Sequence, residues 1–162
     1  MKKINILILF FMIVMFGCAT MPERASVDDL TIRRVADVPG FSKDQLFDKA
    51  KIWLAENFAS SQDVIQYENQ EKGTIIGKGS IPHYRAPGLG MLVRVGDLRF
   101  TIVINTKDDK IRVTIKDIYV MNFTYGRETP LKRHMKIWKP KLEKSIQDLI
   151  AFFSSSQKNE NW

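Results

Sequence analysis

The sequence predicts an α+β domain built in the order strand, helix, four strands, helix. Three observations carry this prediction. A capped amphipathic helix follows residue 42, a long hairpin of alternating apolar and polar residues spans residues 92–120, and a second amphipathic helix follows residue 129. Apolar residues that recur every three to four positions indicate a helix, whereas alternation at every second position indicates a strand.

The chain begins with a cationic stretch and then an apolar one. Lys2 and Lys3 precede the run Ile4–Phe16, which is apolar except for one asparagine. This is the pattern of a secretory signal. A membrane-spanning helix needs roughly 20 apolar residues, and this run is shorter.

The apolar run ends at Met15-Phe16-Gly17-Cys18, which resembles the lipobox of bacterial lipoproteins. The resemblance implies that residues 1–17 are a signal peptide and that Cys18, the single cysteine, carries acyl chains such as palmitate. Two or three chains make a long-lived membrane anchor. Ala19 implies the outer membrane, facing the periplasm, if the organism has two membranes. The alternative is an ordinary secretory signal or an uncleaved anchor, with Cys18 incidental.

Composition narrows the choice of partners. Removal of 17 residues would leave 145 of the 162, enough for one domain with its own core, and would lower the formal net charge from +7 to +5. A basic surface favours anionic lipid, an anionic glycan or an acidic protein partner. Nucleic acid is not expected as a partner in the cell envelope. With Cys18 acylated, no thiol remains for a disulfide.

The segment after the cysteine predicts a tether and then a strand. Residues 18–29 are mostly polar and are expected to form the lipidated N-terminus and a flexible tether. Residues 30–38 alternate imperfectly and predict a first strand, which Pro39-Gly40 ends as a turn.

A helix over residues 43–58 is the strongest local prediction. Ser42 and Gln45 have the spacing of a capping box. Apolar residues from Leu46 to Phe58 follow at helical intervals, and most charged residues lie between them. This stripe is expected to face the core.

Two short strands are predicted at residues 64–69 and 74–81. Gly77 and Gly79 in the second strand predict a bulge, a bend or close packing against a helix. Residues 82–91 contain two prolines and two glycines and therefore predict a loop.

The predicted loop carries His83, Tyr84 and Arg85 in a row. Loops on rigid scaffolds often hold binding residues, so these three are candidates for a binding patch. A solvated hairpin connection is the alternative interpretation.

The two longest strands form a hairpin. Residues 92–106 and 111–120 each alternate apolar and polar side chains, and a polar turn joins them. After Asp117 the apolar phase shifts by one position, which predicts a bulge.

The chain ends in a second amphipathic helix. Thr129 and Pro130 suit its first turn. Pro140 lies inside the apolar pattern and predicts either a kink or a restart of the helix. The domain is therefore predicted over residues 30–153, with a polar, frayed tail at residues 154–162.

Three segments together resemble a family of bacterial envelope proteins known as a domain of unknown function with a TBP-like fold. They are Val38–Leu46, Trp53–Phe58 and Gly73–Gly79. The resemblance spans roughly residues 30–123 and implies a β-α-β-β-β-β-α chain whose antiparallel sheet has both helices on one face. It implies no activity, cofactor or catalytic residue. Fold does not imply function, so DNA binding is not inherited from the TATA-box-binding protein.

In this architecture the second face of the sheet is free, as antiparallel sheets allow. On the hairpin that face would carry Arg99, Arg112 and Lys116. We expect a non-catalytic binding module of the cell envelope, in which this face and the patch at residues 83–85 contact an envelope protein or an anionic glycan. A plain solvated face is the alternative.

An envelope enzyme, such as a hydrolase, is the second hypothesis. The sequence has no nucleophile elbow and no histidine at a metal-ligand spacing, so neither a metal nor another cofactor is predicted. Asp117 and Glu128 could join His134 in a catalytic set only through an unusual geometry. Turnover that is lost in His134→Ala would favour the enzyme.

Overall fold

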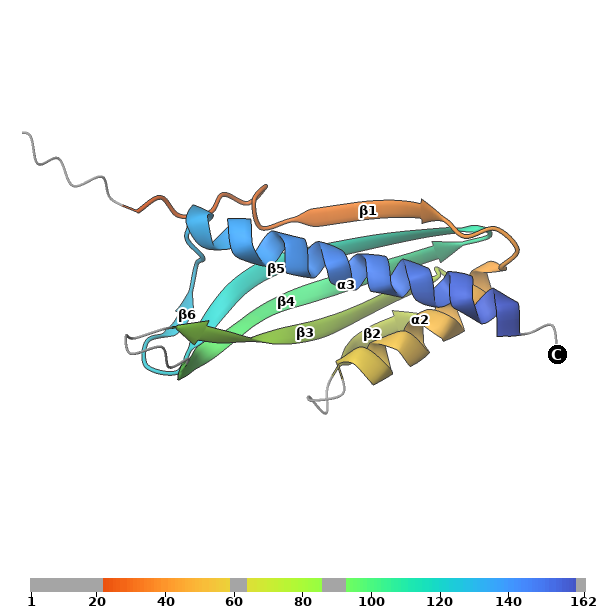
Figure 1. Cartoon of the computed structure of the whole chain (residues 1–162). Coiled ribbons are helices and arrows are strands. Elements are labelled where there is room, and N and C mark those ends of the chain that lie inside the picture. Colours follow the sequence, from red (N-terminus) through yellow and green to blue (C-terminus); the bar gives the residue numbers. More distant parts are fainter. Residues whose placement is uncertain (1–21, 59–63, 86–92, 160–162) are drawn as a thin grey trace, which may run out of the picture.

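The computed structural model describes residues 22–58, 64–85 and 93–159, which form a six-stranded antiparallel sheet with two helices on one face (Figure 1). The predicted α+β fold class is confirmed. The predicted signal segment and Cys18 lie outside the described residues. None of the described helices is long and apolar enough to cross a membrane.

The sheet has the strand order β1-β5-β4-β3-β2, and β6 pairs with the end of β5 beyond β1. The sequence predicted each described element except β6, whose three residues are too few to show an alternating pattern. The elements are β1 (Ile32–Asp37), α2 (Lys43–Asn57), β2 (Ile65–Asn69), β3 (Thr74–Arg85), β4 (Val93–Lys107), β5 (Lys110–Asn122), β6 (Gly126–Glu128) and α3 (Lys132–Asn159).

The core lies between the helices and the sheet. Every second residue of β4 and β5 faces the helices, and the apolar stripes of α2 and α3 cover them. Burial of one large apolar side chain stabilises the fold by roughly 1.5–3 kcal/mol. The buried residues include Leu98, Phe100, Ile102, Ile104, Val113 and Ile115 from the sheet, Leu46, Trp53 and Leu54 from α2, and Trp138, Leu142, Leu149 and Phe153 from α3.

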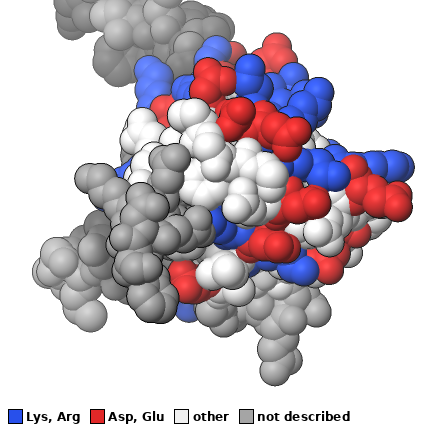
Figure 2. Space-filling view, turned by 90° about the vertical axis from the view of Figure 1, so that its right-hand side faces the viewer, with Lys and Arg blue, Asp and Glu red and all other residues white. Residues whose placement is uncertain are grey.

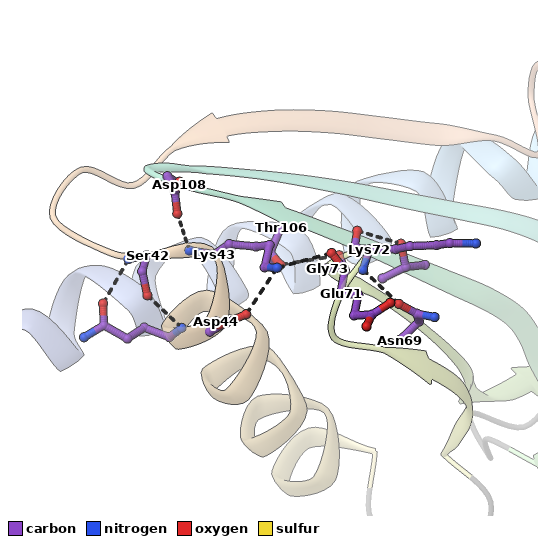
Figure 3. A network of polar contacts seen from close by, with 11 residues as sticks. Ser42, Lys43, Asp44, Asn69, Glu71, Lys72, Gly73, Thr106 and Asp108 are labelled. Carbon is purple, nitrogen blue, oxygen red and sulfur yellow. Dashed lines mark hydrogen bonds and ion pairs between the residues drawn. The ribbon is translucent and has the colours of Figure 1, made fainter.

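The start of α2 is tied to two turns of the sheet (Figure 3). Both bonds of the predicted capping box are present: the Ser42 hydroxyl accepts from the Gln45 N–H at 3.3 Å, and the Gln45 side chain accepts from the Ser42 N–H at 2.9 Å. The Asp108 carboxylate in the β4–β5 turn accepts from the Lys43 N–H at 2.7 Å. A negative charge at this end of a helix is favourable. The Lys43 ammonium donates to the Glu71 carbonyl in the β2–β3 turn.

The C-terminal helix differs from its prediction. α3 is one helix from Lys132 to Asn159, so it does not restart at Pro140, and the tail predicted from Ser154 is helical as far as Asn159. Pro140 is exposed. The carbonyl that it leaves without an intrahelical partner can therefore bond to water. A helix extends readily from a segment that is already formed, which accounts for the continuation of α3 beyond Ser154.

The segment before β1 is packed, although the sequence predicted a flexible tether up to residue 29. Ala25 is 8% exposed and donates its N–H to the Pro130 carbonyl at 2.8 Å. The Lys132 N–H donates to the Glu23 carbonyl at 3.0 Å, and the two side chains form an ion pair. The chain is therefore held from Glu23 onward. A single small apolar residue in a polar run has no periodicity, so the sequence did not indicate this contact.

Two backbone predictions are confirmed. A Cβ atom at Gly79 would lie 2.4 Å from the Phe100 ring and 3.2 Å from the Phe58 ring, so this glycine permits close packing. Asp117 has a φ of +54° and lies where β5 carries one more residue than β4, which is the predicted bulge.

Candidate functional site

The candidate site lies on the face of the sheet opposite the helices. Phe100 and Ile115 point to the helices, so their neighbours Arg99 and Lys116 point the other way and are exposed. Arg112 also lies on this face and is exposed. No described helix covers it (Figure 1). The structure therefore places the three cationic candidates of the hairpin on the face that the sequence predicted for them.

A hollow of about 520 Å³ opens on this face. Small residues of β3 and β4 lie there among long side chains from the neighbouring strands, which leaves space above the sheet. Ligand sites in proteins are commonly roughly 300–1,000 Å³ in volume, so the hollow has room for a small molecule or a sugar unit. Its lining residues are Gln66, Lys78, Gly79, Ser80, Arg94, Asp97, Arg99, Phe100, Thr101 and Tyr119.

The hollow has an excess of positive charge. Lys78, Arg94 and Arg99 line it with one carboxylate, Asp97. Asp97 is 8% exposed, and its Oδ1 accepts from Arg94 Nη2 at 2.6 Å and from Arg94 Nε at 3.1 Å. Among the described residues, neither Lys78 nor Arg99 has an ion-pair partner for its side chain. The lining therefore carries two more cations than carboxylates. By contrast, acidic and basic side chains are interspersed at the end of the molecule seen in Figure 2.

Tyr119 forms part of the wall on β5. The Arg127 guanidinium of β6 lies over its ring, 4.1 Å from the centroid. This contact is within the range of a cation–π interaction and holds the tyrosine in place. In the register of the sheet Tyr119 lies opposite Arg99, so an aromatic ring and a cation face the hollow from adjacent strands.

The predicted candidates on this face are not equivalent. Arg99 lines the hollow. Lys116 lies opposite Thr101, a lining residue, and is therefore beside the hollow. Arg112 lies farther along β5 and donates to the Asn105 side chain at 3.0 Å. Arg99 is thus the candidate that the structure brings into a site.

The prediction of a loop over residues 82–91 is wrong at its start, because β3 continues through Arg85. The pairing of β2 with β3 ends at Lys78. Pro82 therefore lies in the part of β3 that forms the edge of the sheet. A proline without an N–H is tolerated at an edge. Tyr84 and Arg85 extend the strand opposite β4.

His83 lies on the helix side of the sheet, away from the hollow. Its ring centroid is 5.0 Å from that of Trp138 and 6.4 Å from that of His134, both on α3. The structure therefore separates His83 from Arg99, which the sequence had grouped in one binding surface. Within the described residues, no group of three or more His, Cys, Asp or Glu side chains gathers in a way that could hold a metal ion.

Sequence reasoning missed Lys78, Arg94, Asp97 and Tyr119. One signal was available for Asp97, since it lies two residues before Arg99 on β4 and therefore on the same face of the strand. Arg94 is five residues from Arg99 on the same strand and therefore out of step with it, and the register of β3 with β4 shifts beside it. Lys78 and Tyr119 come from neighbouring strands, whose register is set by pairing. The opposition of Lys78 to Thr101 and of Tyr119 to Arg99 cannot be read from either strand alone.

Residues 33–121, more than half of the chain, match the model of a family described as a domain of unknown function (DUF4468) with a TBP-like fold. The chain belongs to this family. The DUF4468 match runs from β1 to β5 and includes every residue that lines the hollow. The family resemblance predicted from the sequence is therefore confirmed.

Two solved structures share the fold. A DUF4468 family protein from Bacteroides ovatus ATCC 8483 has a TM-score of 0.64 and 18% identity, over 80% of this chain and 90% of that one. A TBP-like protein from Parabacteroides distasonis ATCC 8503 has a TM-score of 0.60 and 11% identity, over 76% and 92%. These identities show the fold alone. No curated protein matches the sequence.

Proposed function

We propose that this protein is a lipid-anchored binding module of the bacterial cell envelope, and that the hollow on its open sheet face binds an anionic glycan. The observation that carries the proposal is the hollow itself, a space of about 520 Å³ in which Lys78 and Arg99 have no ion-pair partner among the described residues. The family is defined by its fold and names no activity.

The anchor half of the proposal rests on the sequence. The apolar run that ends at Gly17-Cys18 has the form of a lipoprotein signal, and Cys18 is the single cysteine of the chain. Such an anchor would keep the domain at a membrane surface, where envelope glycans that carry carboxylate or phosphate groups are within reach.

The binding half rests on the chemistry of the hollow. A charge-assisted hydrogen bond contributes about 1.5–3 kcal/mol, so two such bonds from Lys78 and Arg99 would account for at least ~100-fold in affinity. Ser80, Thr101 and the Tyr119 hydroxyl could bond to the hydroxyl groups of a sugar. The single carboxylate in the lining, Asp97, is bonded to Arg94, which favours binding over acid–base catalysis.

The test is a photo-crosslinking residue placed at Thr101 in the lipidated protein in its own cells, with the adducts identified by mass spectrometry. We expect one dominant glycan adduct. The matched control position is Ile52, which is half exposed on α2, on the other side of the molecule. A dominant adduct with an acidic protein segment would mean that the hollow binds a protein and not a glycan. Equal adducts at both positions would refute the hollow as a site.

Charge reversal tests the role of the cations. Lys78→Glu with Arg99→Glu should remove the adduct at Thr101, because the two positive charges of the hollow that have no ion-pair partner among the described residues become negative. Lys136→Glu with Lys144→Glu changes the net charge by the same amount on the exposed side of α3 and should leave the adduct unchanged. Loss in both double variants would mean that overall charge, rather than the hollow, decides binding.

A further inference from the structure

The N-terminal segment is held at one end of the molecule. Arg24 forms a β-bridge with Leu131, directly before α3, and Glu23 is paired with Lys132 at the start of α3. Figure 1 shows the chain leaving toward its N-terminus at the end of the molecule where β6 lies. Cys18 is five residues before Glu23. At 3.3–3.6 Å per residue, this stretch spans at most about 18 Å.

This same end carries an exposed aromatic turn. Phe123 and Tyr125, between β5 and β6, are 62% and 77% exposed. The turn is held in shape by the Asn122 side chain, whose oxygen accepts from the N–H groups of Thr124 and Tyr125 at 2.8 and 3.3 Å. The two rings are therefore presented to solvent by a formed turn, and an exposed apolar patch often marks a protein or membrane contact.

One cation contacts Phe123, and two others lie at the same end of the molecule. The Arg94 guanidinium lies 5.6 Å from the centroid of Phe123, and its side chain is 49% exposed. Arg24 and Arg127 are also exposed at this end. Aromatic rings flanked by cations fit the headgroup region of a bilayer, where the rings lie at the apolar boundary and the cations meet anionic lipids.

We propose that this end of the domain faces the bilayer and that Phe123 and Tyr125 insert into its headgroup region. The inference rests on the anchor of the proposed function, because the short stretch between Cys18 and Glu23 brings this end to the membrane. The hollow lies on the side of the sheet and would remain open to a ligand beside the membrane.

The test uses the lipidated protein in vesicles of phosphatidylethanolamine and phosphatidylglycerol, with and without a lipid that carries a nitroxide on its headgroup. With Cys18 acylated, a cysteine introduced by Thr124→Cys is the single free thiol and takes a fluorescent label. Lys107→Cys is the matched control, since this exposed residue is the last of β4, beside the β4–β5 turn at the other end of the molecule. We expect the nitroxide lipid to quench the label at position 124 several-fold more strongly than the label at position 107.

A second variant separates insertion from mere proximity. Phe123→Ser with Tyr125→Ser in the Thr124→Cys protein should weaken the quenching several-fold. Equal quenching at positions 124 and 107 in a protein of the lipidated mass would overturn the inference and leave the anchor intact. Unchanged quenching without the two rings would overturn insertion. A protein without the mass of acyl chains would refute the anchor, and the inference with it.

Discussion

The substitution Gly79→Ala tests how tightly β3 packs against Phe100 on the helix side of the sheet, opposite the hollow. The added Cβ would lie 2.4 Å from Cζ and 2.5 Å from Cε2 of Phe100, closer than real Cβ contacts. The ring cannot easily swing away. Phe100 is 2% exposed, and the Phe58 ring packs edge-on against it with centroids 5.9 Å apart. Trp53 in turn packs on Phe58.

The size of the effect follows from two opposing terms. Overpacking of a tight core costs about 1–3 kcal/mol. Replacing glycine by alanine in a strand recovers about 0.5–1 kcal/mol of backbone entropy. We therefore expect Gly79→Ala to lower the free energy of unfolding by about 1–2 kcal/mol. Urea unfolding followed by tryptophan fluorescence measures it, as a midpoint lower by roughly 0.5–1 M at an ordinary slope.

The control and the rescue decide whether the clash is the cause. Ser80→Ala, at the next residue and on the open face, should leave the midpoint nearly unchanged. Phe100→Leu removes the ring atoms that the new Cβ meets. The double variant Gly79→Ala with Phe100→Leu should therefore lose less free energy of unfolding than the two single variants lose in sum. Residues in contact couple by about 0.5–3 kcal/mol. An unchanged midpoint in Gly79→Ala, or strict additivity in the double variant, would refute the reasoning.

Three further predictions concern the ends of the elements. Ser42→Ala should cost about 1 kcal/mol in urea unfolding because the cap of α2 loses its acceptor, whereas Ser42→Asp keeps one. Asp109→Ala should cost about 2 kcal/mol, since the bond from the Gly40 N–H is lost and alanine must take a φ of +57°; Asp109→Asn should cost less. The pKa of Asp29 lies below its usual 3.8 because the backbone N–H and the hydroxyl of Ser26 bond to the carboxylate. The ionised Asp29 carboxylate therefore adds to the free energy of unfolding above pH 3.8, and this addition is lost as the pH falls through the lowered pKa. The difference in urea midpoint between wild type and Asp29→Asn should shrink toward zero in that acid range, and a difference that persists there would contradict the assignment.

Much of the fold could be predicted because its signals are local. The capping box at Ser42 needs contacts across three residues, and the alternation along β4 and β5 follows from the two-residue repeat of a strand. The bulge at Asp117 shows in the sequence as a change of apolar phase. Two failures arose where the local signal was misleading or too short. Pro82 indicated a strand end, although an edge strand tolerates proline, and the three residues of β6 were too few to carry a pattern.

The candidate site was predicted in part. Arg99 was placed on the open face by its alternation with buried neighbours. His83 was placed with it because both were expected to be exposed, yet the continuation of β3 turns the His83 ring toward Trp138 on α3. A polar residue after a proline has no sequence signal that tells which face of a strand it occupies until the register is known.

The sequence by itself determined the kinds of elements, their order and the family, because helical and strand periodicities are encoded by near neighbours along the chain. The tertiary structure decided which strands are adjacent and in what register, since β1 pairs with β5 across more than 70 residues. The pairings of β3 with β4 and of β4 with β5 bring Lys78, Asp97, Arg99 and Tyr119 from three strands around one hollow. Contacts of Arg24 and Ala25 with the chain just before α3 hold the N-terminal segment at the end of the molecule where β6 lies, so that this segment and the exposed rings of Phe123 and Tyr125 share one end.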